Sequence, residues 1–199
     1  MIEHEIWEDN PHQYVIGADE VGRGSIAGPI VAASVRIAYK DNKYLEPVKD
    51  SKKMTEKMRN EIFQSINKTS IKINYSTMTN IEIDALGISH CNKKVLEDVL
   101  SPYFESNGLL FVDYVKDINK NVQPITKGED KSLAIALASI MAKVFRDTLM
   151  IQMSLKFPEY GLDKNKGYGT KQHYEAIEKH GIKDFHRKTF LKKLTKYPN

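Results

Sequence analysis

Residues 13–37 have the sequence QYVIGADEVGRGSIAGPIVAASVRI, and their pattern predicts two β-strands joined by a glycine-rich turn. The first strand covers residues 13–20 and the second covers residues 28–37, with Gly22 and Gly24 in the turn between them. Asp19 and Glu20 stand where the first strand passes into the turn. The sequence therefore predicts a β-hairpin that carries two adjacent acidic residues at the end of its first strand.

Asp19 and Glu20 have two interpretations. Neighbouring side chains on a strand point to opposite faces, so both acids face one site only if the backbone twists or bulges, or if one acts from the rim. The alternative is a solvated pair of turn acids. The same turn also satisfies the loose G-x-G-x-x-G/A dinucleotide pattern, but that fingerprint needs a helix after the loop. Residues 28–31 continue as a strand, which excludes it.

The rest of the chain mixes further strands with helices. Alternating apolar and polar residues predict a strand at 70–78, and the apolar run at 109–112 predicts a strand buried on both faces. Helical spacing of apolar residues is found after Thr55, over 81–100 and over 131–156. This order predicts an α/β or α+β layer fold around a central sheet.

Composition excludes several classes of protein. The chain has 199 residues, of which 41% are hydrophobic and 28% charged, so a globular core is expected rather than disorder. Its longest apolar stretches are far shorter than the roughly 20 residues that span a bilayer, and it begins with acidic residues rather than a signal. We expect no membrane association and a cytoplasmic location. The single cysteine, Cys91, excludes an internal disulfide and is interpreted as a small helix residue.

The C-terminal end of the chain is basic. Residues 164–196 contain ten lysines and arginines against three acidic residues, whereas the net charge of the whole chain is only +4. Glycines cluster over residues 160–169 and predict a boundary there. We expect a sheet domain over residues 1–158 and a small helical extension over residues 159–199. The basic charge permits an anionic partner without requiring one, and a solvated helix face is the alternative.

Two further loci carry acidic residues. Asp113 directly follows the buried strand at 109–112, and residues 127–132 read KGEDKS at the start of the long helix. Asp130, taken alone, is explained as a helix N-cap or as an acid that complements the helix dipole. Four acidic positions at strand ends and turns are, however, the oxygen ligands that a hard divalent cation needs.

The sequence resembles ribonuclease HII. The matching motifs are Asp19-Glu20-Val21-Gly22-Arg23-Gly24, Ala27-Gly28-Pro29, Asp50-Ser51-Lys52-Lys53, Phe111-Val112-Asp113, Ala138-Ser139-Ile140-Met141-Ala142-Lys143-Val144 followed by Arg146-Asp147, Lys166-Gly167-Tyr168-Gly169-Thr170, and His186-Arg187 with Phe190. They occur in the order of that family, from residue 14 to about residue 190.

This resemblance implies the fold and the reaction. It implies an RNase H-like central mixed sheet flanked by helices, and an endoribonuclease that acts in DNA replication and repair. The expected substrates are RNA/DNA hybrids, cleaved in the RNA strand, and duplex DNA with embedded ribonucleotides, incised on their 5′ side. Two Mg2+ or Mn2+ ions would support phosphodiester hydrolysis that leaves 3′-OH and 5′-phosphate ends. The implied catalytic and metal-binding residues are Asp19, Glu20, Asp113 and Glu129.

The chain departs from the family pattern at two positions. The family has Asp-Gly after the buried strand, where this chain has Asp113-Tyr114, and a tyrosine there can crowd the site or alter the turn. The family also has Lys-Gly-Asp-Ala-Lys-Ser where this chain has KGEDKS. With the two lysines in register the last catalytic acid is Glu129, and a one-residue slip would make it Asp130. We expect Glu129.

The resemblance also assigns substrate-binding residues. The turn Gly22-Arg23-Gly24 and Tyr168 are expected to read the 2′-hydroxyl of a ribonucleotide, although Tyr168 alone would be interpreted as a turn tyrosine packed on the core. Ser51, Lys52 and Lys53 are expected to hold phosphates. Lys143 and Arg146 share a helix face and either contact phosphate or are solvated. His173, His180 and His186 lack a regular metal-binding spacing and are interpreted as surface or structural residues.

Two other functions stay open from the sequence. One is a module that binds ribonucleotides in DNA without cutting, with its metal site impaired by Glu129 and Tyr114. The other is a different nuclease or recombinase on the same fold, which the Gly-Arg-Gly and Gly-Tyr-Gly-Thr motifs disfavour. A monomer is the default expectation.

Overall fold

The computed structural model describes residues 1–46, 48 and 54–192. Its strands are β1 (Val15–Val21), β2 (Ile30–Ile37), β3 (Lys72–Met78), β4 (Leu109–Asp113) and β5 (Val122–Ile125). The helices are α1 (Ile2–Asp9), α2 (Asn42–Leu45), α3 (Glu56–Ile66), α4 (Asn80–Leu86), α5 (Ile88–Leu100), α6 (Gly128–Lys131), α7 (Leu133–Lys156), α8 (Leu162–Asn165) and α9 (Lys171–His180). Short 3-10 turns cover Tyr39–Asp41, Ser101–Tyr103, Pro158–Tyr160 and Lys188–Leu191.

The five strands form one mixed sheet in the order β3-β2-β1-β4-β5. The predicted hairpin is confirmed, because β1 and β2 pair in antiparallel fashion with Asp19 opposite Ala33. Strand β3 is antiparallel to β2, whereas β1, β4 and β5 run parallel to one another. The carboxyl ends of β1 and β4 consequently meet at the same edge of the sheet, and each of these ends carries an acidic residue.

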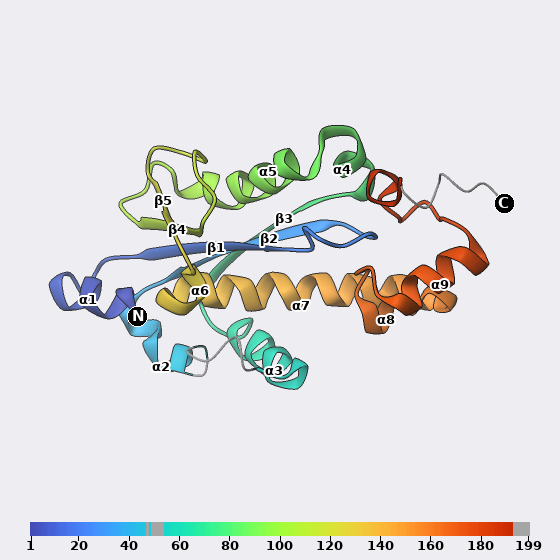
Figure 1. Cartoon of the computed structure of the whole chain (residues 1–199). Coiled ribbons are helices and arrows are strands. Elements are labelled where there is room, and N and C mark those ends of the chain that lie inside the picture. Colours follow the sequence, from blue (N-terminus) through green and yellow to red (C-terminus); the bar gives the residue numbers. More distant parts are fainter. Residues whose placement is uncertain (47, 49–53, 193–199) are drawn as a thin grey trace.

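Helices cover both faces of the sheet (Figure 1). The long helix α7 packs on one face, with α3 beyond it, and α5 packs on the other. Helix α7 approaches closely because its first turns are rich in alanine and β1 has Gly17, where an added Cβ would lie 2.3 Å from the backbone of Ala134. The expected α/β sheet flanked by helices is confirmed.

The C-terminal residues share a third apolar cluster with the hairpin turn. Tyr160, Ile177 and Phe185 pack there against Ala27 from the turn and Met150 from α7. The chain after residue 158 thus has a core in common with the sheet residues that precede it. The expected division at residue 158 stays a prediction. Over the described residues, each helix is too short or too polar to cross a membrane.

Candidate active site

Three carboxylates from separate parts of the chain meet at the edge of the sheet. Asp19 lies near the end of β1, Asp113 ends β4, and Glu129 lies in α6. One oxygen of each lies within 4.8 Å of an oxygen of the other two. The parallel register places Ala18 beside Val112, so the next residue of each strand is an acid at the same height. We call Asp19, Asp113 and Glu129 the acidic triad.

Two hydrogen bonds orient the acidic triad. Asp113 Oδ1 accepts a hydrogen bond from the backbone N–H of Gly128 at 2.9 Å, which ties the end of β4 to the start of α6. The hydroxyl of Ser139 in α7 donates to Glu129 Oε1 at 3.1 Å. Asp130 is exposed and does not belong to the triad. The helical turn α6 therefore turns Glu129 inward and Asp130 outward.

Burial and neighbouring charge raise the pKa of Asp19 well above the ordinary range of an aspartate. Burial is the largest cause, followed by the negative charge of Glu20, and the charge of Glu129 adds to both. The nearby Ser139 hydroxyl opposes this shift, because it can donate to the charged form of Asp19 in place of Glu129. The triad therefore concentrates negative charge that a bound cation would neutralise.

Glu20 lies beside the triad, on the rim of the site. Its side chain is 8% exposed, and Oε1 lies 3.3 Å from the Nη1 of Arg23. Burial raises the pKa of Glu20, and the charge of Asp113 adds to this shift while Arg23 opposes it. Its second oxygen, Oε2, is buried and has no hydrogen-bond partner within the described part of the chain. Buried carboxylate oxygens without a proton donor are the hard ligands that Mg2+ and Mn2+ prefer, so these residues fit a divalent cation.

Arg146 ties the hairpin turn to the loop that carries Tyr168. It is fully buried, and its guanidinium donates to the carbonyls of Pro29 at 2.9 Å, Lys166 at 2.8 Å and Ala27 at 3.2 Å. Gly22 has a φ of +97°, and a Cβ there would lie 2.3 Å from Arg146 Nε. Gly22 is therefore required by the packing of Arg146 and by the backbone of the turn.

The burial of Arg146 fits neither of its two expected roles, a phosphate contact or a solvated surface position. Each of its three guanidinium nitrogens already donates to a backbone carbonyl, and the side chain has no exposed surface to offer a duplex. We assign it a positioning role instead. Lys143 is different, since its ammonium is partly exposed, lies 2.8 Å from Asp147 and lies 5.9 Å from the centre of the Tyr168 ring. A phosphate contact by Lys143 stays a prediction.

A second buried arginine, Arg187, holds the turn from the other side. Its Nε donates to the carbonyl of Gly28 at 3.0 Å, and its Nη1 donates to the carbonyl of Arg23 at 3.1 Å. Burial, and then the charge of Arg146, lowers the pKa of Arg187 to about 10. The sequence motif contains Arg187 but gave no sign of this role, because its partners lie about 160 residues earlier in the chain.

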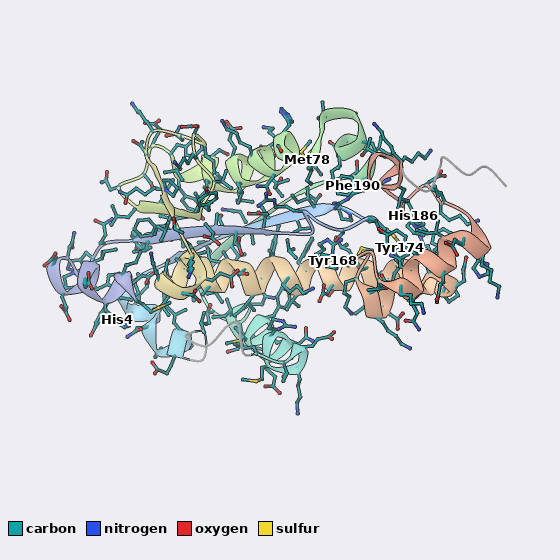
Figure 2. All side chains as sticks on the ribbon, viewed as in Figure 1. His4, Met78, Tyr168, Tyr174, His186 and Phe190 are labelled. Atoms are coloured by element: carbon teal, nitrogen blue, oxygen red, sulfur yellow. The ribbon has the colours of Figure 1, made fainter. Side chains whose placement is uncertain are left out.

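His173 and His186 form a buried pair that anchors the Tyr168 loop. Two backbone groups of Lys183 lie near His186 Nδ1, the N–H at 2.9 Å and the carbonyl at 3.3 Å. Because the N–H is closer, we assign Nδ1 as the acceptor of its hydrogen bond. The Nε2–H of His186 then donates to His173 Nε2 at 3.2 Å, and His173 Nδ1 donates to the carbonyl of Tyr168 at 3.0 Å. Figure 2 shows Tyr168 and His186 at the same end of the molecule. Of the two interpretations, surface or structural residues, the structural one fits His173 and His186.

We predict a pH-dependent stability from this histidine pair. Burial, and then His173, lowers the pKa of His186 to about 4. Between about pH 6.5 and pH 4, His186 is protonated in the unfolded chain but neutral in the folded chain. The free energy of unfolding therefore falls as the pH is lowered through this range, by about 3 kcal/mol at most. Urea unfolding at several pH values measures this. His186→Asn should flatten the profile, and the exposed His12→Asn should not; equal profiles for wild type and His186→Asn would contradict the assignment.

Other predicted residues lie around the same site or outside the described structure. Tyr168 is half-buried, and the guanidinium of Arg146 lies 5.6 Å from the centre of its ring. Gly24 is on the turn surface, where an added Cβ would meet no atom within 4 Å. The predicted phosphate contacts Ser51, Lys52 and Lys53 lie outside the described residues.

The comparisons with known proteins agree with this geometry. A family model described as Ribonuclease HII matches residues 16–193 of the chain. The chain belongs to the ribonuclease HII family. The ribonuclease HII of Clostridioides difficile (strain 630) is 44% identical over 94% of this chain and 73% of that protein. That of Sulfurihydrogenibium sp. (strain YO3AOP1) is 40% identical over 95% of both chains. As a ribonuclease HII family member the chain is a ribonuclease H endonuclease, a hydrolase that acts on RNA/DNA.

Solved structures of lower identity share the fold. The crystal structure of the ribonuclease H2 from Pyrococcus horikoshii OT3 has a TM-score of 0.74 and 24% identity, and the match covers 92% of this chain and 98% of that chain. A crystal structure of Bst-RNase HIII in complex with Mn2+ has a TM-score of 0.66 and 18% identity, and the match covers 92% of this chain and 66% of that chain. These similarities confirm the RNase H-like sheet of this ribonuclease HII family member.

Proposed function

We propose that the chain cleaves the RNA strand of RNA/DNA hybrids and incises duplex DNA on the 5′ side of embedded ribonucleotides, by hydrolysis with two Mg2+ or Mn2+ ions that leaves 3′-OH and 5′-phosphate ends. The proposal depends on one observation above all. The acidic triad, with oxygens within 4.8 Å of one another, lies at the sheet edge that also carries the Gly22-Arg23-Gly24 turn. Every group comes from one chain, so the monomer is the proposed working unit.

The acidic residues would bind the metal ions in two ways. Asp19, Asp113 and Glu129 would hold cations directly, and Glu20 would add its buried Oε2 from the rim. Bound divalent cations supply an activated water and a stabilised leaving oxygen in phosphodiester hydrolysis. Ser139 and the Gly128 N–H keep Glu129 and Asp113 in place before substrate arrives. Preorganised ligands of this kind need little rearrangement in the transition state.

The turn and the Tyr168 loop would recognise the ribonucleotide. The backbone at Gly24 is open to solvent, which lets a sugar approach where a side chain would intervene. Arg146 and Arg187 hold the carbonyls of this region, and the histidine pair holds the Tyr168 backbone. Arg23 and Lys143 are the charged groups placed to contact phosphates from this side, and the basic C-terminal residues would add affinity that depends on salt.

An incision assay tests the proposal. The substrate is a labelled DNA duplex with a single ribonucleotide, incubated with Mg2+, with Mn2+ or with a chelator. We expect one cut on the 5′ side of the ribonucleotide that requires divalent metal. Binding without incision would instead favour the recognition module, and cutting of an all-DNA duplex at a similar rate would favour a different nuclease.

Tyr168→Ala is predicted to weaken selection of ribonucleotides. Loss of the ring should lower the ratio of kcat/KM for single-ribonucleotide over all-DNA duplex about tenfold, because the ring packs on the sugar that distinguishes the two. Tyr168→Phe keeps the ring and should lose less. The metal concentration for half-maximal activity should be unchanged in both variants. An unaltered ribo-to-deoxy preference in Tyr168→Ala would remove Tyr168 from recognition.

A further inference from the structure

A pocket of about 380 Å³ lies next to the acidic site and has no role in the function proposed above. Its walls come from the hairpin turn, from the start of α5 and from the segment after β4. The lining residues that carry the argument are Arg23, Ser89, Tyr114 and Lys116. Arg23 also lies 3.3 Å from Glu20, and Tyr114 directly follows Asp113, so the pocket borders the carboxylates on two sides.

One wall of the pocket carries positive charge. The side chain of Arg23 is 61% exposed and Lys116 is exposed. Ile88 and Ser89 line the same pocket, and they are the first two residues of the 13-residue helix α5. The N–H groups of a first helical turn have no intrahelical acceptor and, with the helix dipole, favour an anion. This wall suits a phosphate group.

Tyr114 supplies an aromatic face in the same place. Its side chain is 67% exposed and lines the pocket. Its backbone has a φ of +59°, in the left-handed region that glycine adopts without strain and a tyrosine does not. An exposed ring beside cationic groups is the arrangement on which nucleic-acid bases stack.

We propose that this pocket binds one nucleotide of the substrate strand next to the reacting phosphodiester, with its base or sugar against Tyr114 and its phosphate at Arg23, Lys116 and the α5 N-terminus. This inference deepens the proposed function and rests on it. It assigns Tyr114, at which the chain departs from the family pattern, to substrate binding.

Metal-free binding tests the pocket without relying on turnover. Fluorescence anisotropy in a chelator would measure the Kd of a labelled single-ribonucleotide duplex for wild type, Tyr114→Phe and Tyr114→Gly. Glycine fits the left-handed backbone, so the Tyr114→Gly protein should fold, and its melting temperature checks this. We expect Tyr114→Gly to bind about tenfold more weakly and Tyr114→Phe to bind like wild type, because only the former loses the stacking face. Tyr44→Ala is the matched control, an exposed tyrosine on α2 at the opposite side of the sheet.

A stacking probe identifies the nucleotide. 2-Aminopurine would replace each base that flanks the ribonucleotide in turn, since its emission falls when it stacks on an aromatic ring. One flanking position should be quenched by wild type and Tyr114→Phe but not by Tyr114→Gly. Lys116→Ala should weaken binding and lower its salt dependence, whereas Lys120→Ala should change neither.

The outcomes separate the two proposals. Equal affinities and equal quenching for wild type and Tyr114→Gly, with incision by wild type intact, would overturn the pocket and leave the proposed function standing. A wild-type protein that neither binds nor incises the duplex would overturn both.

Discussion

Asp113→Asn is expected to reduce incision at least about a thousandfold while duplex binding in a chelator stays within about threefold of wild type. The substitution is nearly isosteric, and the amide oxygen still accepts the hydrogen bond that the Gly128 N–H now donates at 2.9 Å. It removes one of the three carboxylates of the acidic triad. Metal-ion catalysis contributes several kcal/mol of transition-state stabilisation, and each 1.4 kcal/mol is a factor of ten in rate.

Three measurements make the Asp113 result specific. Single-turnover incision gives the rate, anisotropy gives the affinity, and thermal melting gives the stability. Without metal, Asp113→Asn should melt no lower than wild type, because the charge of Asp113 opposes ionisation of the buried Glu20. Asp117→Asn is the control, an exposed acid four residues further along the chain. Turnover of Asp113→Asn at the wild-type rate would exclude Asp113 from the site.

Local sequence patterns predicted the elements that position the site. The hairpin and the long helix α7 have characteristic apolar patterns, and the short length of its apolar run favours a strand for β4. Two of the elements that were missed have identifiable reasons. Helix α1 depends on a distant contact, since Glu3 is buried and accepts hydrogen bonds from Ser132 and Ala134 at the start of α7. Strand β5 contains Pro124 and is largely exposed. A proline is tolerated there because β5 is the outermost strand of the sheet, next to β4 only.

The candidate site was predictable in its acids but not in its supports. Asp113 ends β4 and Asp19 lies near the end of the neighbouring strand β1. Both positions can be recognised in the sequence, because each acid follows an apolar run. Ser139 was assigned no role in the site from the sequence, yet its hydroxyl contacts the triad. The buried position of Arg146 was not predicted. Its three acceptors are backbone carbonyls, and a sequence pattern of side chains does not indicate such partners. Such groups become visible only when the fold brings the segments together.

Glu129→Gln and Asp130→Asn are expected to differ strongly in their single-turnover incision rates, although the two acids are adjacent. Glu129→Gln should reduce the single-turnover rate at least about a hundredfold and raise the metal concentration for half-maximal activity, since it removes one charge of the triad. Asp130→Asn should stay within about twofold, because Asp130 is exposed and outside the triad. The family register and the side-chain placement lead to the same expectation for Glu129.

A shortened side chain refines the test of Glu129. Glu129→Asp keeps the charge but withdraws the carboxylate by one methylene from Ser139, which now donates to it at 3.1 Å. Its loss should be smaller than that of Glu129→Gln and partly recovered with Mn2+, whose coordination geometry is less demanding than that of Mg2+. A larger loss for Asp130→Asn than for Glu129→Gln would mean that α6 shifts by one residue when metal binds and that Asp130 is the ligand.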